Sequence, residues 1–241
     1  KLRMKVPLMV RERSCQNCNM FDNSIFSILS DTQVIDLNAH KYCTVFRKGQ
    51  VLFAENAMPV GLFCIHSGKV KLSTQGIDGK EQIMRLAKSG EIIGYRALVS
   101  NERYHLSAIA LEDCSACVID KTFFMDLAMQ EPRIAQQIFK LISNDLKKAE
   151  DKIISLSQKN VRERMAETLL FIKATYGMEE DNKSLNVRLT REELADYIGT
   201  STESVIRLLS EFNAAGIISL EGKKILILEH DKLVRTANIS Y

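Results

Sequence analysis

The 241-residue sequence predicts an α+β protein built as an antiparallel β-roll, a long helix and a helical domain that ends in a two-stranded wing. Short apolar runs separated by glycine fill residues 42–120, as in an antiparallel barrel or sandwich. From residue 121 apolar side chains recur every three or four positions, which indicates helix. Near the C-terminus, a helix, a short turn and a second helix precede two strand-like runs.

The composition is that of an ordinary globular protein. Hydrophobic residues make up 46% of the chain and charged residues 26%, which argues against disorder. No apolar run approaches the ~20 residues needed to cross a bilayer, so we expect no membrane span and a cytoplasmic protein. The net charge of +3 is too small to indicate a nucleic-acid partner by itself.

Residues 1–20 are expected to form an N-terminal arm, disordered over residues 1–13, and residues 21–130 the β-roll. Glycine stands between or beside the predicted strands, where a turn needs positive φ. These strands are Thr44–Phe46, Val51–Phe53, Gly61–Ile65, Val70–Ser73, Gln82–Leu86 and Cys117–Ile119.

Residues 131–159 are expected to form one long helix. Pro132 suits its first turn, where a missing N–H does no harm. Its apolar stripe is narrow, and such a stripe usually needs a partner helix to cover it. We therefore expect a homodimer seam made of Ile134, Ile138, Leu141, Ile142, Leu146, Ala149, Ile153 and Leu156. The alternative is a surface helix packed only on its own β-roll.

Residues 160–241 have the pattern of a winged helix-turn-helix. A helix is expected over Arg162–Tyr176 and a short strand over Leu185–Leu189. Thr190 with Glu193 forms a capping box for the next helix, Arg191–Tyr197, and Gly199 ends it. The inward positions of that helix are Leu194, Ala195 and Ile198.

The second helix of the motif is expected over Glu203–Ala215, with Ser201 as its cap. Val205, Leu208, Leu209 and Phe212 form its buried stripe. The residues left pointing outward are Thr202, Glu203, Ile206 and Arg207. The wing is expected over Ile217–Leu220 and Lys224–Leu228, turned at Glu221-Gly222. A plain helical hairpin used only in packing is the alternative.

A helix-turn-helix of this kind reads bases from the N-terminal part of its second helix. Acidic residues slightly outnumber basic ones after residue 160, so phosphate contacts must gather on one face. The expected DNA-binding residues are Thr190, Arg191, Ser201, Thr202, Glu203, Ser204, Arg207 and Lys223.

Three further segments occur in the order and spacing of a known family: Arg47-Lys48-Gly49-Gln50, His66-Ser67-Gly68-Lys69-Val70-Lys71-Leu72 and Ser89-Gly90-Glu91-Ile92-Ile93-Gly94. With the long helix and the winged motif, the chain resembles the bacterial cyclic-AMP receptor protein and fumarate-nitrate regulator (Crp/Fnr) family. The resemblance covers nearly the whole chain. It implies a cyclic-nucleotide-binding-like β-roll as sensor, a dimerisation helix and a DNA-binding domain.

By this resemblance the protein is a homodimeric transcription factor that binds an inverted-repeat site of the TGA type and contacts RNA polymerase. Glu203 and Arg207 fall on the family's base-reading positions, and Thr202 stands where the cyclic-AMP receptor branch has an arginine. No nucleophile elbow, Walker loop or zinc-protease motif occurs, so we expect no enzyme. A cyclic-nucleotide-binding module without DNA binding is the alternative function, and residues 185–228 argue against it.

The resemblance weakens at the effector pocket, where Gly94 is followed by Tyr95-Arg96-Ala97-Leu98 instead of the glutamate that binds the ribose. Cyclic AMP is therefore not the expected effector, although Arg96 or Arg103 would offer a charge for the phosphate. The candidate pocket residues are Gly94, Tyr95, Arg96, Leu98, Leu106 and Ser107.

Six cysteines in a chain of this length do not indicate a disulfide scaffold, so we expect reduced thiols. By resemblance to the oxygen-sensing branch, Cys15, Cys18 and Cys117 are candidate ligands of an iron–sulfur cluster. The position six residues after Cys18 is Ser24, so the fourth ligand is missing from the pattern. Asp22 or Cys114 is a candidate to replace it.

Other sensors fit the same residues. A cysteine-pair redox sensor, a zinc site and unreactive buried thiols are alternatives to the cluster. Haem is a further alternative, with His40, His66 and His105 as available ligands. The sequence leaves the effector open.

Overall fold

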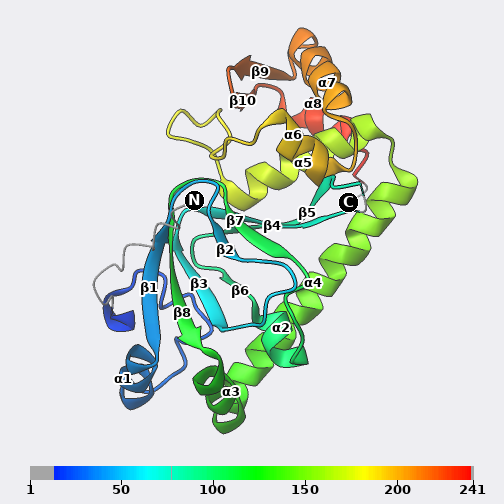
Figure 1. Cartoon of the computed structure of the whole chain (residues 1–241). Coiled ribbons are helices and arrows are strands. Elements are labelled where there is room, and N and C mark those ends of the chain that lie inside the picture. The colour runs from blue at the N-terminus through cyan, green and yellow to red at the C-terminus, as the bar shows by residue number, and fades with distance from the viewer. Residues whose placement is uncertain (1–13, 77, 240–241) are drawn as a thin grey trace, which may run out of the picture. The chain divides into compact units, whose positions relative to one another are not determined.

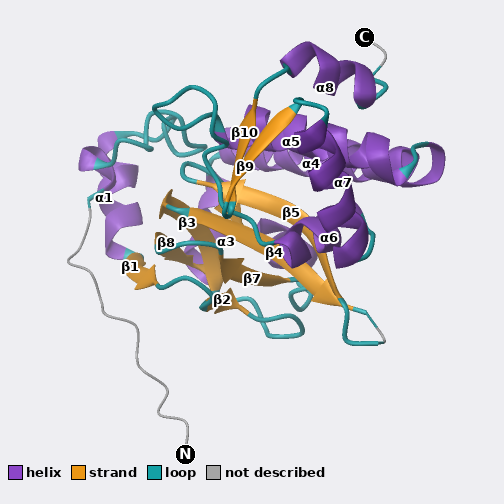
Figure 2. Cartoon of the chain, turned by 90° about the horizontal axis from the view of Figure 1, so that it is seen from above, coloured by secondary structure: helices purple, strands orange, loops and turns teal. Residues whose placement is uncertain are grey.

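The protein is represented by a computed structural model that describes residues 14–76 and 78–239 (Figures 1 and 2). The chain divides into two compact units. The roll unit comprises the chain up to Thr74 together with Met84–Leu146, and the C-terminal unit comprises Gln75–Ile83 together with the chain from Lys147. The predicted disorder of residues 1–13 lies outside the described residues.

Two four-stranded sheets form the roll, as the glycine-punctuated apolar runs predicted. One sheet has the order β1-β8-β3-β6 and the other β2-β7-β4-β5. The pairings of β8 with β1 and β3, and of β7 with β2 and β4, are antiparallel. The strands are β1 (Lys41–Phe46), β2 (Val51–Phe53), β3 (Gly61–Ser67), β4 (Lys69–Gln75), β5 (Glu81–Lys88), β6 (Ile92–Ile93), β7 (Ser107–Ala110) and β8 (Cys114–Asp120).

Strand alternation separates the core of the roll unit into two clusters. Neighbours along β3 point to opposite faces, so Phe63 enters the cluster between the sheets and Leu62 enters an outer cluster. Between the sheets, the rings of Phe53 and Tyr104 stack with centroids 4.0 Å apart. The outer cluster lies under helices, including Phe124 and Ile134. One side of the first sheet is therefore buried by the N-terminal segment and helices rather than by the second sheet.

Local sequence signals mark where the helices of the roll unit begin and end. Ser30 and Gln33 form a capping box for α1 (Asp31–Ala39), and the left-handed Gly94 precedes α2 (Tyr95–Ser100). The chain breaks at Glu131 between α3 (Lys121–Gln130) and α4 (Pro132–Gln158). A long helix beginning at Pro132 is thus confirmed, while α1 was not predicted from the sequence.

The C-terminal unit contains the predicted helix-turn-helix and wing. Its elements are α5 (Val161–Tyr176), α6 (Arg191–Ile198), α7 (Thr202–Ala214), β9 (Ile218–Glu221), β10 (Lys224–Ile227) and α8 (His230–Thr236). Strands β9 and β10 pair antiparallel, which confirms the wing.

Two features of this unit differ from the sequence-based expectations. The strand expected at Leu185–Leu189 does not form, and only isolated bridges join Leu185 to Met178 and Ser184 to Leu226. Its apolar residues are buried without a continuous strand partner, so burial rather than pairing explains the pattern. Helix α8 was not predicted. None of the described helices is long and apolar enough to span a membrane.

Candidate functional site

Local capping positions the first helix of the motif as predicted. Thr190 Oγ1 accepts a hydrogen bond of 3.0 Å from the backbone N–H of Glu193, and the Glu193 carboxylate accepts one of 2.8 Å from Thr190 N. These reciprocal bonds satisfy two N–H groups that a helix start would leave unpaired. At the other end, Gly199 adopts φ 76°, and its N–H bonds the Ala195 carbonyl at 2.9 Å. The predicted capping box and glycine stop are confirmed.

Helix α7 presents the predicted outward face. Ser201 caps it by accepting a 3.2 Å hydrogen bond from Ser204 N. All four residues expected in its buried stripe are buried: Val205, Leu208, Leu209 and Phe212. On the opposite side, the side chain of Arg207 is 66% exposed and Glu203 is exposed. The first turns of α7 therefore present an acid and a base to an external partner.

Arg207 and Glu203 are each held by polar neighbours on or beside α7. Arg207 Nη1 lies 3.0 Å from a Glu211 carboxylate oxygen, and the other oxygen of Glu211 lies 2.6 Å from Arg162. This ion pair uses Nη1 of the guanidinium, which has five N–H donors in all. Hydrogen bonds from its own backbone N–H and from the Ser201 hydroxyl lower the pKa of Glu203. Glu203 is therefore held as a carboxylate, the form that accepts hydrogen bonds.

The wing is tied to α6 by Arg191. Its Nη2 donates to the Gly222 carbonyl at 3.3 Å, burial lowers its pKa, and its Nη1 is buried without a partner among the described residues. Arg191 therefore positions the wing turn, whereas the neighbouring Lys223 is exposed at the surface. Thr202 and Ser204 are half-buried at the start of α7.

Helix α4 buries only the start of its expected dimer seam within its own subunit. Ile134 and Ile138 are 0% and 3% exposed in the outer cluster of the roll, and Leu141 and Ile142 pack against that cluster. Ile134 and Ile138 are therefore core residues of the roll with little exposed area left for a dimer contact, and their part in the seam stays a prediction. The exposed part of the stripe comprises Leu146, Ala149, Ile153 and Leu156. Phe139, which sequence reasoning missed, is 67% exposed.

The six residues expected in an effector pocket lie in different surroundings. Tyr95 and Leu98 are buried in the outer cluster, while Leu106 packs against the cluster between the sheets. Arg96 is at the surface, 3.3 Å from Glu102. Gly94 starts α2, and the Ser107 hydroxyl accepts a 2.9 Å hydrogen bond from Glu55 N. The six residues thus occupy core, turn and surface positions, and the effector pocket expected from them stays a prediction.

Tyr95 belongs instead to a polar network that joins the roll to α4. Arg85 donates to the Tyr95 hydroxyl at 2.8 Å and lies 3.0 Å from Asp145 of α4 and 3.1 Å from Glu91. The Tyr95 hydroxyl itself donates to Asp145. Burial raises the pKa of Tyr95 and keeps it a neutral donor. The Asp145 carboxylate of α4 is thus held by two groups of the roll, the Arg85 guanidinium and the Tyr95 hydroxyl.

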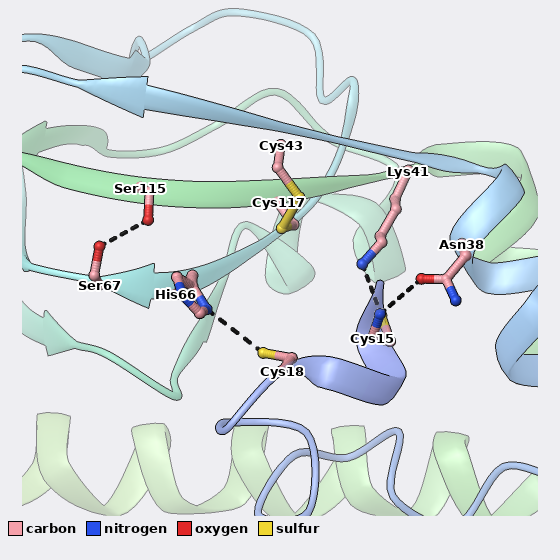
Figure 3. Close-up of a disulfide and its surroundings, with 9 residues drawn as sticks. All are labelled: Cys15, Cys18, Asn38, Lys41, Cys43, His66, Ser67, Ser115 and Cys117. Carbon is pink, nitrogen blue, oxygen red and sulfur yellow. Dashed lines mark hydrogen bonds between the residues drawn. A yellow bond between two sulfur atoms is a disulfide. The ribbon is translucent and has the colours of Figure 1, made fainter. Parts of the chain in front are cut away.

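The expectation that all cysteines are reduced is wrong in this structure. Cys43 of β1 and Cys117 of β8 stand directly opposite each other and form a disulfide (Figure 3). The sequence could not indicate it, because 74 residues separate the two and only the strand register brings them together. Cys15, Cys18, Cys64 and Cys114 are free.

Three of the free thiols and the Cys117 sulfur line one cavity. It measures about 60 Å³ and is lined by Cys15, Cys18, Cys64, Cys117, Lys41 and His66, among others. Lys41 Nζ donates to Cys15 Sγ at 2.9 Å, and Cys18 Sγ lies 3.5 Å from His66 Nδ1 (Figure 3). Sequence reasoning missed Cys64, since nothing in its apolar strand distinguishes a thiol on the outer face from a core residue.

As the described residues stand, no three His, Cys, Asp or Glu side chains are placed to share a metal ion. Cys117 is held by Cys43, and burial raises the pKa of Cys64 to about 12, which favours its thiol. The candidate haem ligands are also separate: His40 stacks on Phe123 at 4.4 Å, whereas His105 lines a surface pocket and His66 the thiol cavity.

Comparisons with known proteins match both units. Residues 43–131 match the cyclic nucleotide-binding domain, and residues 163–236 match the Crp-like helix-turn-helix domain. The chain is 30% identical over 228 residues to the fumarate and nitrate reduction regulatory protein of Vibrio cholerae, covering 94% of this chain and 91% of that protein. It is also 30% identical over 222 residues to the anaerobic regulatory protein of Aggregatibacter actinomycetemcomitans, covering 91% and 86%.

Solved structures share the fold. FixK2 from Bradyrhizobium japonicum superposes with a TM-score of 0.76 at 22% identity, over 83% of this chain and 99% of that one. A CooA mutant from Carboxydothermus hydrogenoformans superposes with a TM-score of 0.71 at 22% identity, over 92% and 96%. Because a capped helix-turn-helix with a wing follows a β-roll here, and the likeness to named regulators runs almost end to end, this chain belongs to the Crp/Fnr family of DNA-binding transcriptional regulators and not to a class of enzymes.

Proposed function

We propose that this regulator binds an inverted-repeat DNA site as a homodimer and that a redox or effector signal at the roll unit controls the binding. The observation that carries the DNA part is the exposed pair Glu203 and Arg207 on the first turns of α7. Arginine can bond guanine O6 and N7 together, and a glutamate carboxylate can accept from cytosine N4. The helix end that carries them is the end that enters the major groove in this motif.

Around this pair, the other expected contacts divide by their roles. Lys223 is exposed at the wing tip and is suited to a phosphate, while Arg191 supports the wing through Gly222. Ser201, Thr202, Ser204 and Thr190 lie at the two helix starts, where hydroxyls and backbone N–H groups meet phosphates. Specificity would therefore rest on Glu203 and Arg207, and positioning on the rest.

Dimerisation through α4 is supported by the spacing of its exposed apolar residues. Phe139, Leu146, Ala149, Ile153 and Leu156 are exposed, and together with the half-buried Ile142 they follow one another three and four residues apart. That alternation is the heptad pattern of a helix paired with a second copy. Leaving Ile153 66% and Leu146 60% exposed to water would be unfavourable for a monomer. A symmetric pair of α4 helices covers this stripe.

The control of DNA binding would start in the roll unit, where Glu91 and the thiols line the same cavity. Glu91 is bonded to Arg85, and Arg85 is bonded to Asp145 of α4. A change at the cavity wall can thus bias the position of α4 through charged groups that touch. The signal would shift the population between two orientations of the DNA-binding domains about a hinge near Asn160, and the two orientations would differ in DNA affinity. The same proposal includes contact with RNA polymerase and a location in the cytoplasm.

Selection from a random DNA pool tests the proposed function directly. The expected product is an inverted repeat whose half-sites lie about one helical turn apart, because protein two-fold symmetry is mirrored in the operator. Sedimentation of the complex should give two chains per duplex. Enrichment of an unrepeated site, or one chain per duplex, would overturn the dimer; no enrichment at all would overturn sequence-specific binding.

A further inference from the structure

The turn between α6 and α7 presents a row of backbone carbonyls to other parts of the C-terminal unit. Helix α6 ends at Ile198, and the last carbonyls of a helix have no partners within it. Here the five consecutive carbonyls of residues 196–200, called the turn carbonyls below, each accept a hydrogen bond from a side chain. The donors come from the β4–β5 hairpin, α4 and α5, and they are Lys80, Gln82, Lys152 and Arg164.

The tip of the β4–β5 hairpin supplies two of these donors. Lys80 Nζ donates to the Thr200 carbonyl at 3.1 Å, and Gln82 Nε2 donates to the Asp196 carbonyl. In keeping with these contacts, Gln75–Ile83 belongs to the same compact unit as the helix-turn-helix, although β4 and β5 are strands of the roll. The hairpin tip and the turn are therefore held together by direct hydrogen bonds.

Helix α4 supplies a third donor from its C-terminal part. Lys152 Nζ donates to the Tyr197 carbonyl at 2.6 Å and lies 4.3 Å from the centroid of the Tyr197 ring, which is a cation–π contact. Burial lowers the pKa of Lys152 to about 8, because its ammonium is held away from water. Arg164 of α5 supplies the remaining bonds, of 3.3 Å to the Ile198 carbonyl and 3.4 Å to the Gly199 carbonyl.

Packing and charge favour the same contact. A Cβ atom at Gly199 would lie 3.3 Å from Leu156 Cδ2 of α4 and 3.9 Å from Gln82 Oε1 of the hairpin, so the turn backbone approaches both elements closely. Three of the four donors are cations, and they meet the C-terminal end of α6. The dipole of a helix favours positive charge at that end.

The reading face of α7 stays open in this arrangement. Glu203 is exposed and the Arg207 side chain is 66% exposed, although both follow the turn carbonyls by at most two helical turns. Ser201 still caps α7 by accepting a 3.2 Å hydrogen bond from Ser204 N. A contact that masked the reading residues would have buried them. The donors are therefore placed to hold α7 and not to cover it.

We propose that Lys152 and Gln82 are positioning residues for DNA reading, because they fix the turn and thereby the direction in which α7 carries Glu203 and Arg207. Both lie outside the predicted DNA-binding domain, in α4 and in the hairpin of the roll. The inference rests on the proposed base reading by Glu203 and Arg207. Lys80 is exposed, so its bond contributes less. The contacts raise the fraction of chains that can read DNA, and the apparent Kd is the intrinsic Kd divided by that fraction.

Substitutions that remove a donor and keep the size of the side chain test the proposal on the DNA site selected from a random pool. Lys152→Met and Gln82→Met should each weaken the Kd for that site by about 2- to 10-fold per subunit, which is the effect of one hydrogen bond on an equilibrium. On random DNA the loss should be smaller, because base contacts carry the sequence information and phosphate contacts do not. Lys152→Arg keeps a charged donor and should recover most of the affinity.

Lys48→Met is the matched control. Lys48 is an exposed lysine at another turn of the roll, so this variant loses the same charge and should bind as the wild type does. Denaturant unfolding of each DNA-free variant checks that it folds. Hydrogen exchange of the DNA-free chain should rise at the amides of residues 199–204 in Lys152→Met and not in Lys48→Met, because these amides lie in the turn that Lys152 holds.

A double-mutant cycle with Arg207→Ala separates positioning from general support. If Lys152 acts by directing α7, Lys152→Met should weaken the Kd less in the Arg207→Ala chain than in the wild type, because one of the positioned groups is already gone. A side chain that only supports the fold would cost the same in both chains.

Four results would overturn the inference: wild-type affinity in both folded methionine variants, equal losses on selected and random DNA, additive losses in the cycle, or unchanged hydrogen exchange in Lys152→Met. Tighter binding in either variant would also overturn it and would make the contact an inhibitory one. A wild-type chain that prefers no site would instead refute the proposed base reading. The hydrogen-exchange result contains no DNA and still decides whether Lys152 holds the turn.

Discussion

The substitution Arg207→Ala tests whether the exposed end of α7 reads bases. Within the described part of the chain, the ion pair of Arg207 is an exposed i,i+4 pair with Glu211, and pairs of this kind contribute about 0.3–0.5 kcal/mol. Its side chain is 66% exposed and leaves the buried stripe of α7 intact. The variant should therefore fold as stably as the wild type to within about 0.5 kcal/mol.

On DNA the expected loss is much larger. One bidentate arginine–guanine pair is worth about 1–3 kcal/mol of discrimination, and a symmetric dimer makes two. The dimer should lose about 2–6 kcal/mol on its selected site, since well-separated contacts add. At about 1.4 kcal/mol per factor of ten, this means a roughly 30-fold to 10⁴-fold weaker Kd. On random DNA the affinity should fall several-fold at most, because the substitution removes one positive charge per subunit that attracts the phosphates.

Fluorescence anisotropy on the selected site, on the site with one guanine per half-site replaced, and on random DNA measures these losses. Arg207→Ala should bind the first two sites equally, whereas the wild type should distinguish them. Lys232→Ala, an exposed cation on α8, is the matched control for lost charge. Equal losses on selected and random DNA would refute the base-reading role and leave Arg207 a phosphate contact.

Three further predictions concern the wing, α4 and the loop before α6. Lys223→Ala should weaken selected and random DNA alike and reduce the slope of log K against log salt by about 1 per subunit, in a salt titration. Ile153→Ser should shift the chain toward monomer in sedimentation with little change in its unfolding, whereas Ile138→Ala should cost about 2–5 kcal/mol in denaturant unfolding because it empties a buried site. Hydrogen bonds from the Ser184 hydroxyl and from the backbone N–H groups of Ser184 and Lys183 lower the pKa of Asp181 from 3.8 to about 2. The Asp181 carboxylate therefore stabilises the folded state above its ordinary pKa, and this contribution is lost as pH falls through about 2. Asp181→Asn should accordingly lower the unfolding midpoint at neutral pH, and the difference from the wild type should vanish near pH 2; a pH-independent difference would contradict this linkage.

Local chemistry explains which parts of the C-terminal unit could be predicted. The Thr190–Glu193 capping box, the stop at Gly199 and the buried stripe of α7 depend on residues within one or two helical turns of each other. Such signals survive in a single sequence because no distant contact is needed to produce them. The run Leu185–Leu189 has strand-like apolar residues but no neighbouring strand edge, so the same reasoning failed there.

Tertiary packing decides which apolar residues of α4 are buried by the same chain, and the apolar periodicity of the helix could not. The apolar positions from Ile134 to Leu156 look alike in the sequence, and the phase of a helix says which of them share a face. Only packing tells which part of that face the same chain already covers. The outer cluster covers Ile134 and Ile138 and leaves Phe139 and Ile153 exposed. The exposed part of the proposed dimer face therefore lies further toward the C-terminal part of the helix than the sequence-based expectation placed it.

In the same way, the strand register decides which cysteines line the cavity of the roll unit. From sequence alone, Cys114 and Cys117 are near neighbours and Cys64 is remote, so Cys114 is the natural candidate for a missing ligand. In the sheet the order reverses, because Cys64 stands opposite Cys117 while Cys114 faces the other side. The register also places Cys64 opposite Ile92 of β6, one residue from Glu91. Glu91 is ion-paired to Arg85, which holds Asp145 of α4. Glu91 also lines the cavity that Cys64 lines, so the ion pairs begin at the cavity wall. A change of charge or contact at this cavity wall would therefore reach α4 through the ion pairs of Arg85 with Glu91 and Asp145.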